Sequence, residues 1–263
     1  MASPAPDTPA GPARALIEAA RVLAGEVGSL RFGEPVAHVY NPLDYASRSH
    51  EAYLRRYGDS TKRFVMLGMN PGPYGMMQTG VPFGEVAAVR DWMGIDAPVD
   101  PPASQHPKRP IQGFDCPRSE VSGRRVWAWA RLRYGSADAF FEQAFVLNYC
   151  PLVFLEASGR NRTPEQLPRH ELKPLQAACD RHLAACVAAL RPQWLVGVGG
   201  FAEKRLRALV EGDLLDGAVA RDLRVGQILH PSPASPAANR GWADAVDARM
   251  TEYGLIAPLS SKG

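Results

Sequence analysis

Four short apolar runs recur along the chain, and a turn signal rich in proline or glycine follows each of them. They are residues 63–69, 144–150, 193–199 and 224–230. Apolar runs of this length are typical of buried strands. Apolar residues at three- and four-residue spacing predict helices over residues 13–30, 44–57, 84–93, 120–134, 168–190, 201–210 and 239–253. Buried strands that alternate with helices favour an α/β fold, with a parallel sheet covered by helices on both faces.

Polar side chains that can act on a ligand stand where these strands end. Asn70 follows the first run, Asn148 lies near the end of the second, and His230 ends the fourth. Parallel sheets bind ligands beyond the carboxyl ends of their strands. We therefore expect two side-chain amides and one imidazole at one rim of the sheet, and no carboxylate at the end of any of the four strands.

Length and composition indicate one globular domain. The chain has 263 residues, of which 46% are hydrophobic and 22% charged. We expect a domain over residues 14–258, preceded by a disordered Ala/Pro-rich tail at 1–13 and followed by a short tail at 259–263. The N-terminal segment lacks the basic start and apolar centre of a signal peptide. No run approaches the roughly 20 apolar residues of a membrane span. We expect no membrane partner and a monomer.

The cysteine content and the net charge do not by themselves identify the function of the protein. Cys116, Cys150, Cys179 and Cys186 show no CxxC spacing, so we expect buried thiols, no metal site and no cofactor. The net charge is only +3, although arginines outnumber lysines by 25 to 5. Arginine suits phosphate contacts, but coding sequence of high GC content produces the same excess.

One stretch is strongly basic, with a local net charge of +5 over residues 105–133. Its cations are Lys108, Arg109, Arg118, Arg124, Arg125, Arg131 and Arg133. Both a solvated face and a phosphate-binding surface fit this pattern. A second loop, residues 158–162, adds Arg160 and Arg162. If these segments bind phosphate, Arg125 and Arg160 would each contact one phosphate group.

Residues 197–202 fit the pattern G-x-G-x-x-A directly after a predicted strand. This pattern occurs in dinucleotide-binding proteins, which also need an acidic residue at the end of the next strand. The next strand ends at His230, and Asp213 and Asp216 fall in a predicted loop. A nucleotide-dependent oxidoreductase therefore stays only a minor alternative.

Several of these segments together resemble one family, the single-strand-selective monofunctional uracil-DNA glycosylases of the uracil-DNA glycosylase superfamily. The similar segments are residues 68–76 (GMNPGPYGM), 78–85, 108–113 (KRPIQG), 119–123 (SEVSG), 148–152 (NYCPL), 158–161 (SGRN), 230–233 (HPSP) and 238–242 (ANRGW). The resemblance extends over about residues 15–255. It implies a three-layer sandwich with a four-stranded parallel sheet between helices.

The resemblance also implies roles at the rim. Asn70 would position the attacking water, and His230 would face the departing base. Met69, Gly72, Phe83 and Asn148 would bind the base, with Phe83 stacking on it and Asn148 reading its edge. We expect backbone groups around Pro151 to fix the orientation of the Asn148 amide.

Two loops would contact DNA by the same resemblance. Their residues are Ser158, Gly159, Arg160 and Asn161 in one loop, and Pro231, Ser232, Pro233, Ala234, Ser235 and Arg240 in the wedge loop. Ala234 departs from the family pattern, which has a basic residue in the wedge. Arg240 is the candidate to compensate for it.

The function implied is hydrolytic excision of uracil and 5-substituted uracils from single- and double-stranded DNA, the first step of base excision repair. No lysine lies in the rim segments, so no lyase step is expected. The partner is DNA, and the location is cytoplasmic, or nuclear if the source is eukaryotic. A non-catalytic module that binds damaged or single-stranded DNA remains the alternative.

Overall fold

The computed structural model describes residues 11–258, and the four apolar runs form one parallel sheet. Its strands, in spatial order, are β3 (Ala144–Asn148), β2 (Phe64–Gly68), β6 (Trp194–Val198) and β7 (Arg224–Ile228). β2 pairs in register with β3 and β6, so that Gly68 lies opposite Asn148. The sheet confirms the predicted α/β fold, and it places the ends of β2 and β3 side by side.

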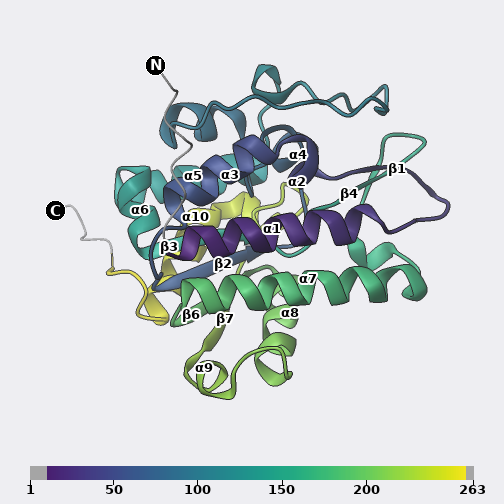
Figure 1. Cartoon of the computed structure of the whole chain (residues 1–263). Coiled ribbons are helices and arrows are strands. Elements are labelled where there is room, and N and C mark those ends of the chain that lie inside the picture. The colour runs from purple at the N-terminus through teal and green to yellow at the C-terminus, as the bar shows by residue number, and fades with distance from the viewer. Residues whose placement is uncertain (1–10, 259–263) are drawn as a thin grey trace, which may run out of the picture.

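Helices lie on both faces of the sheet and in the connections between its strands. The helices of residues 11–258 are α1 (Pro12–Gly28), α2 (Pro42–Tyr45), α3 (Ser47–Tyr57), α4 (Met76–Thr79), α5 (Val121–Tyr134), α6 (Ala137–Gln143), α7 (Arg169–Leu190), α8 (Gly200–Glu211), α9 (Gly217–Asp222) and α10 (Pro236–Glu252). Figure 1 shows α1 and α7 side by side in front of the sheet, with α10 behind it. The central strand β2 is fully buried between these layers, and β6 is buried except at Trp194, as their unbroken apolar sequences predict.

Three local predictions need correction. The helix expected over 44–57 is divided at Ala46 into α2 and α3. The helix expected over 84–93 contains a π-helical segment, η1 (Ala88–Trp92). The helix α1 begins at Pro12, inside the expected tail, and Ala13 is only 1% exposed because it packs into the core. Residues 1–10 and 259–263, which hold the rest of both expected tails, lie outside the described residues.

The sequence did not predict a second sheet. It is antiparallel, in the order β1 (Val36–Tyr40), β4 (Val153–Glu156) and β5 (Asn161–Arg162). Short 3-10 turns, η2 (Gly113–Asp115) and η3 (Pro164–Gln166), stand in the loops. Since β4 begins five residues after β3 ends, the rim segment 149–152 is held between the two sheets.

Two further features concern the thiols and the character of the helices. All four cysteines are free and buried, which confirms the prediction of buried thiols. Among the helices of residues 11–258, none has the length and apolar character needed to cross a membrane.

Candidate active site

The loops after β2 and β3 hold each other through backbone hydrogen bonds. Tyr149 N–H donates to the carbonyl oxygen of Gly68, and Cys150 N–H donates to that of Met69, both at 2.9 Å. The Asn70 side chain then donates its Nδ2 to the carbonyl oxygen of Leu152 at 3.4 Å. This bond orients the amide, because only its nitrogen can donate to the carbonyl oxygen of Leu152. The oxygen Oδ1 of Asn70 is left to accept a hydrogen bond from a water.

Gly68 brings together the two predicted base-binding side chains. A Cβ at Gly68 would lie 2.3 Å from Oδ1 of Asn148 and 2.7 Å from Cε2 of Phe83. Both distances are shorter than any real Cβ contact, so only glycine allows this arrangement. The amide edge of Asn148 therefore lies beside the ring of Phe83, above the last residue of β2. An edge that can form hydrogen bonds next to an aromatic face is what a flipped base requires.

The orientation of Asn148 is set differently from our expectation. Its Nδ2 donates to Sδ of Met76, 3.3 Å away at the start of α4. The backbone around Pro151 bonds to other groups, so the expected lock is wrong. Thioether sulfur is a weak acceptor. The amide is therefore oriented, but by a weak bond that a stronger hydrogen-bonding partner can replace.

Phe83 has an unusual backbone conformation for a side chain of its size. Its φ is 53°, in the left-handed region. Its carbonyl oxygen accepts from Nε1 of Trp127 at 2.8 Å and from the backbone N–H of Glu85 at 2.7 Å. A Cβ at Gly123 would come within 2.1 Å of that oxygen. The glycine thus lets α5 approach and hold Phe83 in its strained position.

Glu120 is a site residue that sequence reasoning missed. A Cβ at Gly72 would lie 1.7 Å from its Oε1, and a Cβ at Gly75 would lie 2.2 Å from its Oε2. The carboxyl therefore fills the space that side chains at both glycines would occupy. The pKa of Glu120 is raised to about 7, mainly because the carboxyl is buried; a hydrogen bond from the Gly123 backbone lowers it, and the charge of nearby Glu85 adds a smaller increase. The sequence shows Gly72, Gly75 and Glu120, but no feature of it indicates that the carboxyl packs against the two glycines.

His230 is held as a neutral donor. The backbone N–H of Ser232 donates to Nδ1 of His230 at 3.1 Å. A ring that accepts at Nδ1 carries its proton on Nε2. Burial lowers the pKa of His230, which favours the neutral ring. The free end of the imidazole is therefore an N–H that can donate to an anion.

The glycines after β6 serve packing. A Cβ at Gly199 would lie 3.1 Å from Cβ of His230, and one at Gly197 would lie 2.3 Å from the backbone nitrogen of Glu203 in α8. Both glycines thus allow close contacts within the protein. These contacts account for the dinucleotide-like pattern at 197–202 without a cofactor.

The wedge loop that follows His230 is rigid and partly exposed. Pro231 is buried, whereas Pro233, Ala234 and Arg240 are exposed. Ser232 accepts at its Oγ from the backbone N–H of Ala234 at 3.1 Å. Ser235 caps the start of α10. The exposed residues therefore project from a preformed turn.

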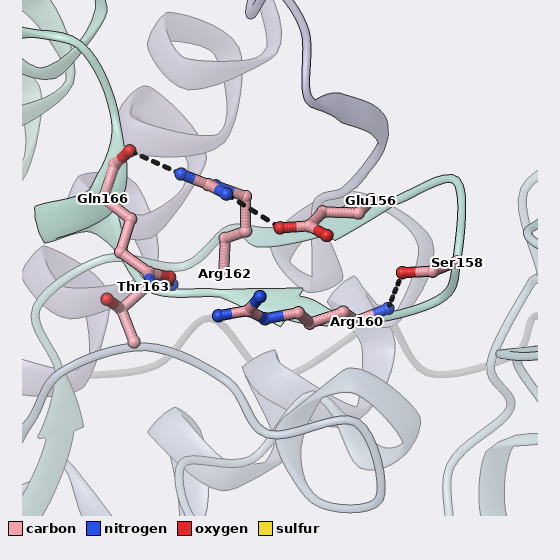
Figure 2. Close-up of polar contacts among 6 residues, drawn as sticks. All are labelled: Glu156, Ser158, Arg160, Arg162, Thr163 and Gln166. Carbon is pink, nitrogen blue, oxygen red and sulfur yellow. Dashed lines mark hydrogen bonds and ion pairs between the residues drawn. The ribbon is translucent and has the colours of Figure 1, made fainter.

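The hairpin between β4 and β5 carries the other predicted DNA-contacting residues. Arg160 N–H donates to Oγ of Ser158 at 3.3 Å, and Gly159 turns the chain with a φ of 83°. Figure 2 shows that the two arginines of the hairpin differ. Arg162 is held by Glu156 at 2.7 Å and by the carbonyl oxygen of Gln166 at 2.9 Å. The exposed side chain of Arg160 has no such partner among the residues drawn.

The structure thus gathers Met69, Asn70, Phe83 and Asn148 around the end of β2. His230 stands at the end of β7, two strands away in the same sheet. Within residues 11–258, no group of three or more His, Cys, Asp or Glu side chains is placed to hold a metal ion.

Comparison with known proteins identifies the family. A sequence model of the uracil DNA glycosylase superfamily matches residues 55–248. The single-strand selective monofunctional uracil DNA glycosylases of Mus musculus and Rattus norvegicus are 46% and 47% identical over 241 residues, which is 92% of this chain and 84% of each relative. The crystal structure of SMUG2 from Pedobacter heparinus is similar in fold, with a TM-score of 0.62 and 18% identity over 90% of this chain and 97% of that one. The chain therefore belongs to the uracil DNA glycosylase superfamily and, within it, to the single-strand selective monofunctional uracil-DNA glycosylases.

Proposed function

We propose that this protein is a monofunctional DNA glycosylase that hydrolyses the N-glycosidic bond of uracil and of 5-substituted uracils such as 5-hydroxymethyluracil. Its substrates are single- and double-stranded DNA, and the product is an abasic site that enters base excision repair. The observation that carries the proposal is the placement of the Asn148 amide beside the Phe83 ring over Gly68. These two groups offer a hydrogen-bonding edge and a stacking face to one planar base.

Stabilisation of the leaving base falls to His230. Cleavage leaves negative charge on the uracil, largely at O2 and N1, and positive charge on the sugar. A neutral imidazole with its proton on Nε2 donates to the developing anion without first losing a proton. The Ser232 N–H keeps that tautomer in place. Donors that are fixed before the reaction act in this way at oxyanion sites.

Asn70 prepares the nucleophile. Its Nδ2 is engaged by Leu152, so Oδ1 accepts a hydrogen bond from the water that attacks the anomeric carbon. An amide is a poor general base, and it carries no charge to offset that of the sugar. Leaving-group stabilisation therefore dominates, and turnover is modest.

A lyase step needs an amine at the anomeric carbon. Lys62 lies at the opposite end of the sheet, just before β2, where its Nζ donates to Oγ of Ser60 and to the carbonyl oxygen of Phe141. The segments at the rim contain no lysine. The strand therefore remains uncut after base release.

The test is excision from an oligonucleotide that contains one uracil. We expect alkali to cut the strand after incubation with the enzyme, and no cut without alkali. His230→Ala should lower the single-turnover rate by about 10²–10³, as loss of one oxyanion donor does. Asn70→Ala should lose rate and keep affinity for uracil DNA. Binding without base release by the wild type would support the alternative of a non-catalytic DNA-binding module.

A change in which base is excised tests whether Asn148 reads the edge of the base. Uracil offers an N3–H donor and an O4 acceptor, and an amide can pair with both. Asn148→Asp removes the donor toward O4 and adds an acceptor for the amino group of cytosine. We expect loss of most uracil excision and a small gain in cytosine excision, because cytosine N3 still lacks its proton. Unchanged uracil excision by this variant would assign base reading to another residue.

A further inference from the structure

The arginines of the basic stretch at residues 105–133 bind different kinds of partner in the structure. Arg125 bonds to the wedge loop, and Arg133 bonds to Asp247 and to the carbonyl oxygen of Ala257. Arg131 lies over the ring of Trp92. Arg109 and Arg118 behave differently, because both turn toward a single neutral side chain.

That side chain is Tyr74, four residues after Asn70 in the same loop. Its Oη accepts from Nη1 of Arg118 at 2.5 Å and from Nη1 of Arg109. The two guanidinium carbons lie 4.5 Å and 5.5 Å from the centre of its ring. Both lone pairs of the phenol oxygen are thereby used. Its own O–H proton is left as a third donor beside two positive charges.

Two cations at one hydroxyl repel each other. Within residues 11–258, neither guanidinium forms an ion pair with a carboxylate, and Arg118 is exposed. An anion placed between them would offset the repulsion and accept from all three donors. Arginine offers the planar, forked donor set that phosphate oxygens match.

The position of this cluster relates it to DNA. Nε of Arg109 donates to the carbonyl oxygen of Gly159 at 3.0 Å, in the hairpin loop that carries Arg160. The backbone of Arg109 is fixed in addition, because its carbonyl oxygen accepts from Tyr40 Oη at 3.0 Å. The cluster therefore lies between the loop of Asn70 and the hairpin, and it is ordered before any ligand binds.

We propose, on the basis of the glycosylase function proposed above, that Arg109, Arg118 and Tyr74 form a binding site for one phosphodiester group of the DNA strand. The site binds the sugar–phosphate backbone of the DNA next to the protein loop that carries Asn70. It contributes affinity that is independent of base sequence, and it takes no part in bond cleavage.

The experiment uses the full chain and a single-stranded oligonucleotide with a 2′-fluorinated deoxyuridine, whose glycosidic bond resists cleavage. The dissociation constant is measured over a range of salt concentrations for the wild type and for Arg118→Ala. Each phosphate contact on a single strand contributes about 0.7 to the slope of log K against log salt. We expect Arg118→Ala to lower the slope by about that amount. Arg124→Ala is the matched control, since Arg124 is an exposed arginine of α5, and its slope should equal that of the wild type.

A second measurement locates the phosphate. Methylphosphonates replace the phosphates one at a time, and each substitution is combined with Arg118→Ala. At one position the two losses of affinity should fail to add, because both remove the same contact. Equal salt slopes for Arg118→Ala and the wild type, or additive losses at every position, would overturn the phosphate site. Uracil excision by the wild type on a normal oligonucleotide is assayed separately. If the wild type excises uracil but Arg118→Ala and the wild type have equal salt slopes, only the phosphate site is rejected. If the wild type does not excise uracil, the glycosylase function is rejected.

Discussion

Nη1 of Arg125, in α5, donates to the carbonyl oxygen of Pro231 at 3.0 Å, immediately after His230. The same nitrogen also reaches the carbonyl oxygen of Ser232 at 3.4 Å, and Nη2 donates to Oδ1 of Asn239 at 2.8 Å. One guanidinium thus holds the start of the wedge loop and the first turn of α10. Arg125 orients this loop, and the guanidinium is not free for the phosphate contact that the sequence suggested.

Arg125→Ala should therefore affect duplex substrates more than single strands. A wedge acts only where a base must be extruded from a helix, which costs a few kcal/mol. We expect the single-turnover rate on duplex DNA to fall about tenfold more than the rate on a single strand. Arg124→Ala, which removes a neighbouring charge without touching the loop, should leave the ratio of the two rates unchanged. Equal losses on both substrates would contradict a role in the wedge.

Gly68→Ala should abolish most excision while DNA affinity persists. The new methyl group would overlap both Asn148 Oδ1 and the Phe83 ring, so the Asn148 amide and the Phe83 ring must separate, and the proposed base site would be lost. Single-turnover rate and dissociation constant are measured together. Gly25→Ala in α1 is the control, because a Cβ there meets nothing within 4 Å. It should keep activity and raise the unfolding free energy by about 0.5–1 kcal/mol, as alanine does in helices. Wild-type excision by Gly68→Ala would refute the shared placement of the two side chains.

Glu120 should make stability depend on pH. Its pKa is about 7 in the folded protein, against an ordinary value of 4.5. Between these values the unfolded chain has released the proton and the folded chain still holds it, so the free energy of unfolding falls as pH rises. One pKa unit corresponds to about 1.4 kcal/mol. The wild type should therefore lose about 2–3 kcal/mol relative to Glu120→Gln between pH 4.5 and pH 7.

Comparison with Glu120→Gln isolates this carboxyl from the buried histidines. Burial lowers the pKa of His50 and of His182 to about 4, so their contribution to stability rises with pH in much of the same range. It is present in both proteins and cancels in the difference. Denaturant unfolding at several pH values measures it, and a difference that stays constant with pH would remove Glu120 from this role.

The two arginines of the hairpin form a matched pair. Arg160 is exposed, so Arg160→Ala should lower the salt slope of DNA binding by about 0.7–0.9. Arg162→Ala should leave the slope unchanged. It should reduce stability by about 1 kcal/mol, because Glu156 and the carbonyl oxygen of Gln166 lose their donor. Salt titrations and thermal unfolding of both variants distinguish these roles, and a slope change in Arg162→Ala would contradict the assignment.

The sequence by itself determined the main sheet and its rim. Buried parallel strands are continuous apolar runs, so β2, β3 and β6 could be located from the order of apolar residues along the chain. β7 lies at the edge of the sheet and is only partly buried, and the His230-Pro231 turn that follows it marked its position. Parallel strands end at the same edge, so Asn70, Asn148 and His230 were expected to share one rim. The roles of Asn70 and His230 came from the resemblance of whole segments to a known family.

Only the tertiary structure decided how the polar groups pair. Arg125 and Pro231 are 106 residues apart, and nothing local to either one indicates their bond. The same holds for Glu120 against Gly72, and for Met76 as the partner of Asn148. The strands of the second sheet are too short to show a clear alternation of apolar and polar residues, so the sequence pattern did not indicate them. A long side chain can reach any acceptor that folding brings within a few ångströms, so its partner depends on the packing of distant segments and cannot be deduced from the residues beside it.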